Sequence, residues 1–483
     1  MQRSKLVELL KKLSAVELRW FVEYARSPFF NKHERLIRLI DLFCEEAPLY
    51  EGEKLNRKNI FAALFPKEKY KEQKVNDLVS YSVRLLEEFI AYLNYNKYPL
   101  LQKHHLLTEL RERESDKHFQ SSLRELNSKL EAYPYRDEVY FQNKYLLEKE
   151  ADLFFIKKES RQRDDSLQKK VDNLDLFYIS VKLKNCCEMI NRKNIVSSEY
   201  SPRMLDDILN YLKKNIHDFK DVPSVTIYYQ VLLTLIESEN EKNYAELKEL
   251  LAKNTHRFSQ EEARQMYDYA QNYCIKKINS GSTEYSIELF NLYKLLLEKK
   301  IIFEGNYLSQ WDYKNIVSIG LRLEEYAWTK NFIENYKEKI VVEARENAYI
   351  YNLASLYYSK EDYNIALKLL QKVEFTDLFY HLGSKSMLLK IYYEMEETEP
   401  FYSLVDTFKM YLKRNRLISG YQNEVHFNLI KFSKKVFNLK IRLSQNKRSV
   451  GKKEIEKLKE KINGTKNITN LQWLKEKINE LSL

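Results

Sequence analysis

The chain has 483 residues, roughly three times the length of a common single domain, so we expect several structural units. It contains only 8 glycines and 8 prolines, together roughly 3% of the residues against an average of about 12%. This scarcity argues against phosphate-binding glycine loops, sheets joined by tight turns and long flexible linkers. A hydrophobic fraction of 44% is sufficient to build a core, so a disordered chain is also excluded.

Helical periodicity runs through almost the whole chain and predicts an all-α fold in four regions. We expect an N-terminal helical region over 1–98, which ends in a long helix over about 72–95, and a long-helix region over 99–225. A series of helical hairpins follows over 226–415, and a basic helix with a C-terminal helical pair occupies 416–483. Capping boxes and one Ser-Pro pair predict helix starts at Ser14–Glu17, Asn31–Glu34, Ser259–Glu262 and Ser201–Pro202.

The N-terminus has charges every few residues, and no stretch approaches the roughly 18 continuous apolar residues of a membrane span. The four cysteines are Cys44, Cys186, Cys187 and Cys274, too few for a disulfide framework in so long a chain. We therefore expect a cytoplasmic protein with reduced thiols and no membrane span.

The net charge of +11 is concentrated near the C-terminus. Residues 407–453 hold 13 Lys and Arg and one acid, Glu424, so this segment is +12 and the remaining 436 residues sum to −1. Within it, one predicted helix carries an apolar stripe with spacings of three and four residues: Val425, Leu429, Phe432, Val436, Leu439 and Leu443. The basic residues Lys431, Lys434, Lys435 and Arg442 fall mostly on the opposite side of that helix.

Two interpretations of this basic face remain open. It is either the solvated side of a surface helix, or a docking surface for nucleic acid, an acidic protein or an anionic membrane. No arginine-glycine run, RNA-binding signature or zinc finger supports the nucleic-acid interpretation.

The best hairpin covers 349–373. Leu353, Ala354 and Tyr357 share one face of a first helix, a polar turn follows over 359–362, and Ala366 and Leu370 share one face of a second helix. Small residues at Ala354 and Ala366 allow the two backbones to approach closely. A weaker copy lies 37 residues earlier, and two degenerate copies extend the pattern over roughly 259–413.

This spacing resembles the tetratricopeptide repeat, although Leu378 stands where the typical closing proline would be. The wider pattern is similar to a group of uncharacterised bacterial helical-repeat proteins, through the segments 27–31, 64–66 and 388–393. The resemblance implies an α-solenoid of antiparallel hairpins with a helical N-terminal region and a C-terminal helical cap. It implies no activity.

Stacked hairpins of this kind usually hold a peptide or a partner helix on the surface lined by their first helices. The candidate partner-binding residues on that surface are Asn315, Tyr349 and Asn352, together with Lys431, Lys434, Lys435 and Arg442 of the basic helix. An equally plain interpretation is that Asn315, Tyr349 and Asn352 are ordinary exposed helix residues. We expect a scaffold or adaptor that binds a protein or peptide; a nucleic-acid-associated regulator that uses 407–453 is the alternative.

No catalytic, cofactor or metal motif stands out, so an enzyme is not predicted. His104, His105, Glu114 and His118 are better explained as surface residues of charged helices than as a metal cluster. The segment 55–88 vaguely resembles the helix–turn–helix part of winged-helix regulators, but the helical pattern continues through 91–95 where a β wing would follow.

Overall fold

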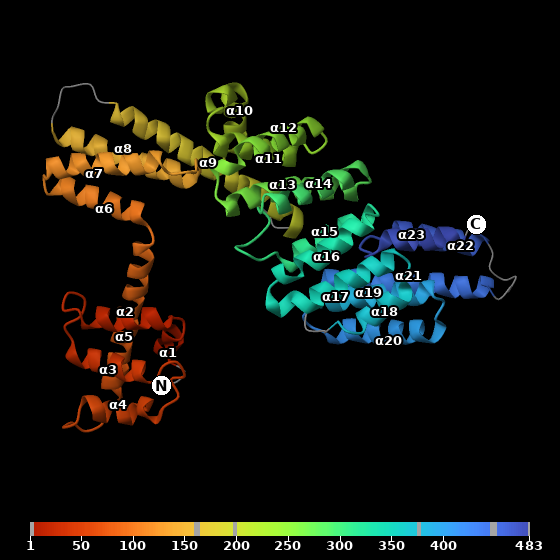
Figure 1. Ribbon diagram of the computed structural model, residues 1–483, viewed down its shortest axis with the longest axis horizontal. Coiled ribbons are helices and arrows are strands. Elements are labelled where there is room, and N and C mark those ends of the chain that lie inside the picture. The colour runs from red at the N-terminus through yellow and green to blue at the C-terminus, as the bar shows by residue number, and fades with distance from the viewer. Residues whose placement is uncertain (1–3, 159–164, 197–199, 374–377, 445–451, 482–483) are drawn as a thin grey trace. The chain divides into compact units, whose positions relative to one another are not determined.

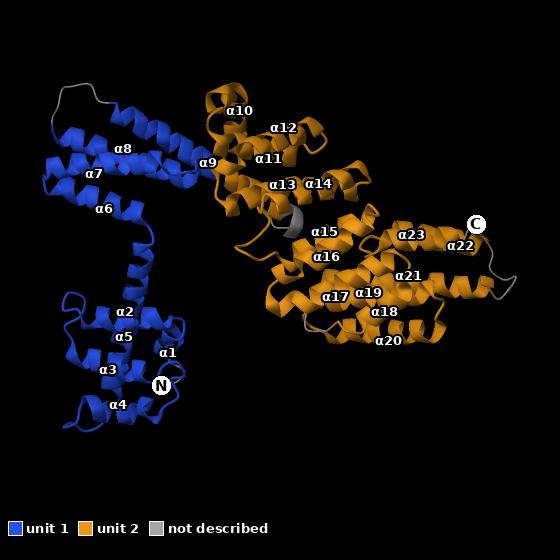
Figure 2. Cartoon of the chain, in the orientation of Figure 1, with its two compact units in different colours: residues 1–182 blue, residues 183–483 orange. Residues whose placement is uncertain are grey.

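The computed structural model describes residues 4–158, 165–196, 200–373, 378–444 and 452–481 (Figure 1). Throughout these ranges the regular elements are helices, apart from an isolated β-bridge between Glu304 and Tyr307. The predicted all-α fold is therefore confirmed. The chain divides into two compact units, residues 1–182 and 183–483, with the boundary inside α9 (Ser166–Val196) (Figure 2).

The first part of unit 1 is organised around α5 (Glu72–Asn96), which matches the predicted long helix. Four helices pack against α5: α1 (Lys5–Leu10), α2 (Ala15–Arg26), α3 (Glu34–Glu45) and α4 (Arg57–Leu64). Val75, Leu86 and Phe89 of α5 are at most 2% exposed in the resulting core. This residue spacing gives α5 one continuous apolar face.

The second part of unit 1 begins after α5 and continues into α9. Its helices are α6 (Pro99–Glu112), α7 (Asp116–Glu131), α8 (Glu138–Lys157) and the beginning of α9. α6 packs against both α7 and α8, and Lys170 of α9 forms an ion pair with Asp152 of α8.

Unit 2 contains the end of α9 and α10 (Leu205–Asn215), followed by consecutive helix pairs. The pairs are α11 (Pro223–Ile236) with α12 (Glu241–Asn254), α13 (Gln260–Asn279) with α14 (Glu284–Glu298), α15 (Gln310–Arg322) with α16 (Tyr326–Tyr336), α17 (Val342–Ser359) with α18 (Tyr363–Leu370), and α19 (Leu378–Glu394) with α20 (Thr398–Arg414). Short 3-10 segments lie at Glu53–Leu55 in unit 1 and at Ile216–Phe219, Thr255–Arg257 and Lys337–Lys339 in unit 2.

The two helices of each pair pack against one another, and the second helix also packs against the first helix of the next pair. The first helices α15, α17, α19 and α21 (Gly420–Ser444) contact one another in that order. At the C-terminus, α22 (Lys452–Gly464) and α23 (Leu471–Glu480) share one apolar core with α19, α20 and α21. The predicted C-terminal helical pair is thus present, and its first helix ends at Gly464.

α15 and α17 end in the same way. Glu324 and Glu361 have left-handed φ angles of 59° and 62°. The residue after each donates its N–H to a carbonyl five residues back, from Glu325 to Gly320 and from Asp362 to Tyr357, both at 2.9 Å. This is the hydrogen bond of a Schellman helix end, in which glycine usually holds the left-handed position. The two turns are 37 residues apart, the spacing that the sequence pattern predicts.

The small side chains of the pairs lie where the backbones are closest. Ala354 and Ala366 are both fully buried. In the preceding pair, an added Cβ on Gly320 would lie 2.3 Å from Oγ1 of Thr329 and 3.6 Å from the ring of Phe290. Such close approach is possible only with a residue that has little or no side chain.

Two of the predicted helix starts are wrong, whereas α13 begins as predicted after Ser259 with only one half of its capping box formed. The capping box at Ser14 and Glu17 is present. Asn31 instead donates to the carbonyl of Ala25, and His33 Nδ1 accepts the N–H of Leu36 at the start of α3. At Ser259 the hydroxyl accepts from Glu262 N–H, but the Glu262 carboxylate is engaged by Tyr228.

The fourth predicted start, Ser201–Pro202, is also wrong, because α10 begins three residues later, at Leu205.

Two further expectations concern thiols and membrane spans. All four cysteines are free, and Cys186 and Cys187 are buried. In the described ranges, no helix has both the length and the apolar character needed to cross a membrane.

The contact at Gly320 supports a test of the close packing in unit 2. We expect Gly320→Ala to destabilise unit 2 by about 1 to 3 kcal/mol, because its new methyl group meets the stiff, fully buried Thr329. Thr329→Ala should be close to neutral alone and should restore most of the loss in the double variant. Tryptophan fluorescence during urea unfolding measures this, since three of the four tryptophans lie in unit 2. Equal destabilisation with and without Thr329→Ala would refute the steric explanation.

Candidate functional site

The three candidate residues on the first helices do not form one cluster. Asn315 of α15 is exposed and forms a hydrogen bond with Tyr293 of α14, which opposes the rise in the Tyr293 pKa caused by burial. Tyr349 of α17 is half-buried, with the Lys337 ammonium 4.4 Å from its ring centre. Asn352 is only 1% exposed and donates to the carbonyl of Ala348 at 2.8 Å. The expectation that Asn352 lies at the surface is therefore wrong, because neighbouring first helices cover α17 on both sides.

An exposed aromatic pair lies on the same set of helices. Trp311, at the start of α15, is 39% exposed, and Phe379, at the start of α19, is 47% exposed. Their ring centres are 4.9 Å apart in an edge-to-face arrangement, and Trp311 also stacks on Tyr380 at 6.1 Å. Sequence analysis missed this pair because the two residues are distant in the chain and meet only when the first helices stack. The pair offers an apolar anchor at the surface.

A polar pocket of about 550 Å³ lies beside α13 and the loop that precedes α15. The cation among its lining residues is Arg264, whose guanidinium donates hydrogen bonds to Glu304 at 2.5 Å and to Asp312, the neighbour of Trp311, at 3.0 Å. Asp268 also lines the pocket, and burial raises its pKa to about 6, an effect that Arg264 opposes. Glu261 is a further lining residue. The pocket therefore has more carboxylates than cations and favours a positively charged group.

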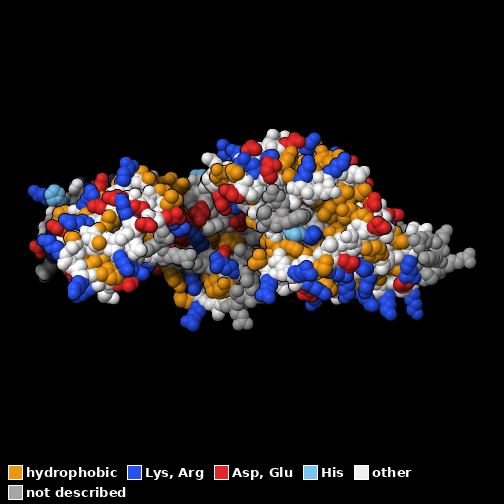
Figure 3. All heavy atoms as spheres, turned by 90° about the horizontal axis from the view of Figure 1, so that it is seen from below, with side chains coloured by type: hydrophobic (Ala, Val, Ile, Leu, Met, Phe, Trp, Pro, Cys, Tyr) orange, Lys and Arg blue, Asp and Glu red, His pale blue; other side chains and the backbone are white. Residues whose placement is uncertain are grey.

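The basic helix is α21, and its predicted apolar stripe is confirmed for five of six residues. Val425, Leu429, Phe432, Val436 and Leu439 are buried, whereas Leu443 is 37% exposed. In the space-filling view, Lys and Arg side chains gather along the lower edge of unit 2, toward the right of the picture (Figure 3). Two further cations of the predicted segment, Lys447 and Arg448, lie outside the described residues.

The four candidate cations of α21 point in different directions. Lys431 and Lys435 are exposed, and both ammonium groups lie within 6 Å of the Phe432 ring centre, at 5.3 and 5.9 Å. Lys434 instead turns toward Tyr402 of α20, 5.4 Å from its ring centre. Arg442 forms a 3.0 Å ion pair with Glu454 of α22. In the described part of the chain, no carboxylate lies within 4.0 Å of the three lysine ammonium groups.

A groove of about 290 Å³ separates α21 from α22. It is lined by Lys435, Asn438, Leu439 and Arg442 from α21 and by Glu454, Lys457, Leu458 and Lys461 from α22. Sequence reasoning placed the cations of α21 on a face but missed the second wall, because after Lys453 the three lysines of α22 are balanced by three glutamates and give no net charge along the chain. The groove brings four cations and one carboxylate together.

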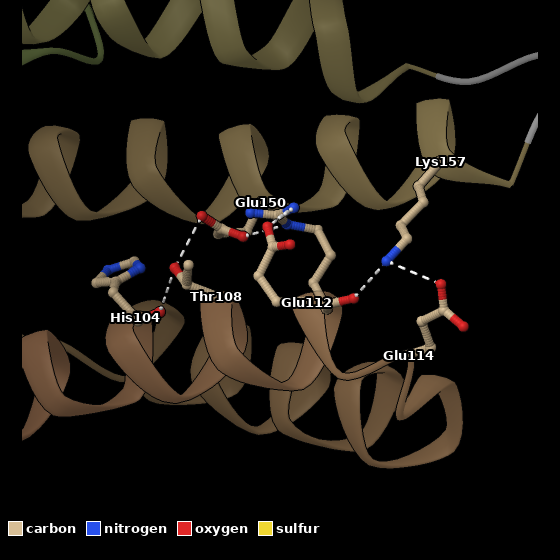
Figure 4. Close-up of polar contacts among 7 residues, drawn as sticks. His104, Thr108, Glu112, Glu114, Glu150 and Lys157 are labelled. Atoms are coloured by element: carbon tan, nitrogen blue, oxygen red, sulfur yellow. Dashed lines mark hydrogen bonds and ion pairs between the residues drawn. The ribbon is translucent and has the colours of Figure 1, made fainter.

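Unit 1 contains a polar cluster between α6 and α8 (Figure 4). The carboxylate of Glu150 accepts from Arg111 Nε at 2.9 Å and from Thr108 Oγ1 at 3.0 Å. Lys157 contacts both the carbonyl of Arg111 and the carboxylate of Glu114. Arg111 and Glu150 are largely buried and neutralise one another, which offsets the cost of desolvation, whereas the Lys157–Glu114 pair is largely exposed. The arrangement holds α6 against α8.

His104 of this cluster is buried rather than at the surface, contrary to the expectation. It is 6% exposed, and its Nε2 lies 3.0 Å from Asn143 Oδ1. Burial lowers its pKa, so the imidazole is held neutral. Among the described residues, no group of three or more His, Cys, Asp or Glu side chains is arranged to hold a metal ion.

The segment that resembles a helix–turn–helix module spans α4 and the first part of α5. Its apolar side chains are committed to the core of unit 1: Ile60, Phe61, Val75, Leu78 and Leu86 are buried. Within the described ranges, no strand follows α5, and the chain continues into α6.

No family model, curated protein or solved structure matches the chain, so similarity adds nothing to what the geometry indicates.

The Glu150 cluster predicts that two glutamate substitutions, one on α8 and one on α6, reduce the stability of unit 1 by very different amounts. We expect Glu150→Ala to destabilise unit 1 by about 2 to 4 kcal/mol, because it leaves the Arg111 guanidinium buried without its main partner. The matched control is Glu109→Ala, whose ion pair with Arg113 is solvent-exposed and should contribute less than about 1 kcal/mol. Urea unfolding followed by circular dichroism measures both. Similar small losses in the two variants would show that the buried pair contributes little.

Unit 2 should lose stability in mild acid because of a buried histidine. Burial, with a smaller contribution from Lys385, lowers the pKa of His381 to about 4. An unfolded chain binds this proton near pH 6.5, so the unfolded state takes up more protons and stability falls as the pH drops from about 6.5 to 4. His381→Phe keeps the ring stacked on Tyr411, and we expect it to reduce the acid-induced loss by about 1 to 2 kcal/mol.

The measurement for His381 is the urea midpoint of tryptophan fluorescence at pH 7 and pH 4.5. His217→Asn serves as the control, since the His217 side chain is 74% exposed. If His381→Phe and His217→Asn change the pH dependence equally, burial of His381 is not its cause.

Proposed function

We propose that this protein is a non-enzymatic helical-repeat scaffold that binds a protein or peptide partner through the first helices of unit 2. We further propose that these pairs form an array of tetratricopeptide-like hairpins. The observation that carries the proposal is the exposed pair of Trp311 and Phe379, which two different first helices bring together. Aromatic side chains at a protein surface commonly dominate the free energy of partner binding.

The order of the helices supports this proposal. α15, α17, α19 and α21 contact one another consecutively, so side chains from several first helices share one surface. Repeat proteins of this type bind extended segments because their surface extends with each added pair. Asn315 remains a candidate contact on this surface, whereas Asn352 does not, because it is buried.

The charges near Trp311 indicate the chemistry of the partner. Its neighbour Asp312 is joined through Arg264 to a pocket that also contains Glu261, Asp268 and Glu304. A segment that carries an apolar side chain beside a Lys or Arg would place the first on the aromatic pair and the second in the pocket. We propose such a segment as the ligand of this surface.

A second candidate function is association with nucleic acid through residues 407–453. The groove between α21 and α22 favours it, because that groove combines cations from two helices. This candidate is compatible with the scaffold function, since it uses a different part of unit 2.

The scaffold proposal is tested by affinity capture from lysate with and without nuclease treatment, followed by calorimetry with the purified captured protein. We expect Trp311→Ala to weaken binding of the purified partner at least tenfold, because truncation of an exposed aromatic anchor typically costs about 2 kcal/mol or more. Ile287→Ala is the control, since Ile287 is an exposed apolar residue of α14, 58% accessible, outside this surface. The purified partner should bind this variant as it binds the unmodified protein.

Two results would contradict the scaffold proposal. One is a captured protein whose retention disappears with nuclease, which would indicate a nucleic-acid bridge. The other is equal affinity of Trp311→Ala and Ile287→Ala for the purified partner.

A further inference from the structure

The geometry points to the groove between α21 and α22 as a binding site for the sugar-phosphate backbone of a nucleic acid. This inference rests on the second candidate function and assigns it to particular side chains. The residues of the site are Lys435 and Arg442 on α21 and Lys457 and Lys461 on α22. The ligand is identified by its regularly spaced negative charges, and the groove contains no feature that would distinguish one base from another.

The cations stand on both walls of the groove. Lys457 and Lys461 are one helical turn apart, so they lie on the same side of α22. Their side chains and that of Lys435 are exposed, and in the described ranges no carboxylate lies within 4.0 Å of these ammonium groups. Ammonium groups that are not engaged by protein carboxylates are available to neutralise phosphates and release their counterions.

The cationic line continues along α21 beyond the groove. Lys431, Lys435 and Arg442 follow one another at helical spacing, and eleven residues of helix cover about 16 Å. One strand of a duplex carries a phosphate about every 3.4 Å along the helix axis, so this distance covers several phosphates. The apolar stripe on the other side of α21 is buried in the core, which fixes the direction of these cations.

The floor of the groove favours nucleic acid over an acidic protein. Leu439 and Leu458 are only 3% and 7% exposed, so a partner helix would find almost no apolar surface to bury. Protein interfaces depend on a buried apolar centre, whereas binding to a phosphate backbone takes its free energy mainly from counterion release. Asn438 is the remaining polar lining residue of α21, and its side-chain oxygen accepts from Tyr402.

Glu454 is the only acid among the lining residues and gives the inference a discriminating test. Its carboxylate forms a 3.0 Å ion pair with Arg442 across the groove. A phosphate entering the groove would be repelled by Glu454 and would compete with it for Arg442. Removing this negative charge should therefore strengthen the binding of nucleic acid, which an ion pair with a purely structural role would not do.

The experiment measures fluorescence anisotropy of a labelled DNA duplex of about 20 base pairs, and of a single strand of the same length, with the full chain at several salt concentrations. We expect the double variant Lys457→Glu/Lys461→Glu to weaken binding at least tenfold and to reduce the slope of log K against log salt by about 2, since two phosphate contacts are lost. Glu454→Gln should tighten binding by about two- to fourfold.

The matched control is Lys213→Glu/Lys214→Glu, which makes the same change of net charge at two exposed lysines of α10. Its affinity should stay within about twofold of the unmodified protein. Circular dichroism and the urea midpoint verify that each variant is folded. If Lys457→Glu/Lys461→Glu does not fold, Glu454→Gln still tests the inference.

The outcomes separate the site from the function. If the unmodified protein binds neither probe at low salt, nucleic-acid binding and the groove are both refuted, and the scaffold proposal is unaffected. If it binds but both double variants weaken binding equally, nucleic-acid binding stands and the groove is refuted. If polyglutamate at equal charge displaces the duplex completely and binds more tightly than it, the groove is a docking site for an acidic protein and the inference is overturned.

Discussion

The packing of each helix pair against the next is the constraint on which unit 2 depends. A single pair cannot cover its apolar faces, so the second helix of each pair packs against the first helix of the following one. Close approach within a pair requires small residues, as at Ala354 and Ala366. Because the pairs must stack, first helices distant in sequence become neighbours, and this brings Trp311 and Phe379 together.

The same packing constraint determines which side of α21 carries its charged side chains. Its apolar stripe is committed to the C-terminal core, so Lys431 and Lys435 are left at the surface. α22 joins that core through Ile455, Leu458 and Ile462, and this places Lys457 and Lys461 opposite α21. The groove is thus a consequence of apolar packing, and the charges that this packing leaves outside line it.

The polar groups inside the protein have a different role. Glu150 with Arg111 in unit 1 and His381 in unit 2 are buried, and each is accommodated by a partner or by loss of charge. They make stability sensitive to substitution and to acid. None of these groups needs a ligand to explain it, so the surfaces of unit 2 are the better candidates for function.

The sequence by itself determined that the fold is all-α, where α5 lies, how the hairpin of α17 and α18 is spaced, and which face of α21 is buried. These features depend on local periodicity, which each helix carries in its own residues. Only the tertiary structure decided that Asn31 bonds the end of α2 instead of capping α3, that Asn352 and His104 are buried, and that α22 supplies the second wall of the groove. Those outcomes depend on which neighbour covers a residue, and that is decided by stacking between segments far apart in the chain.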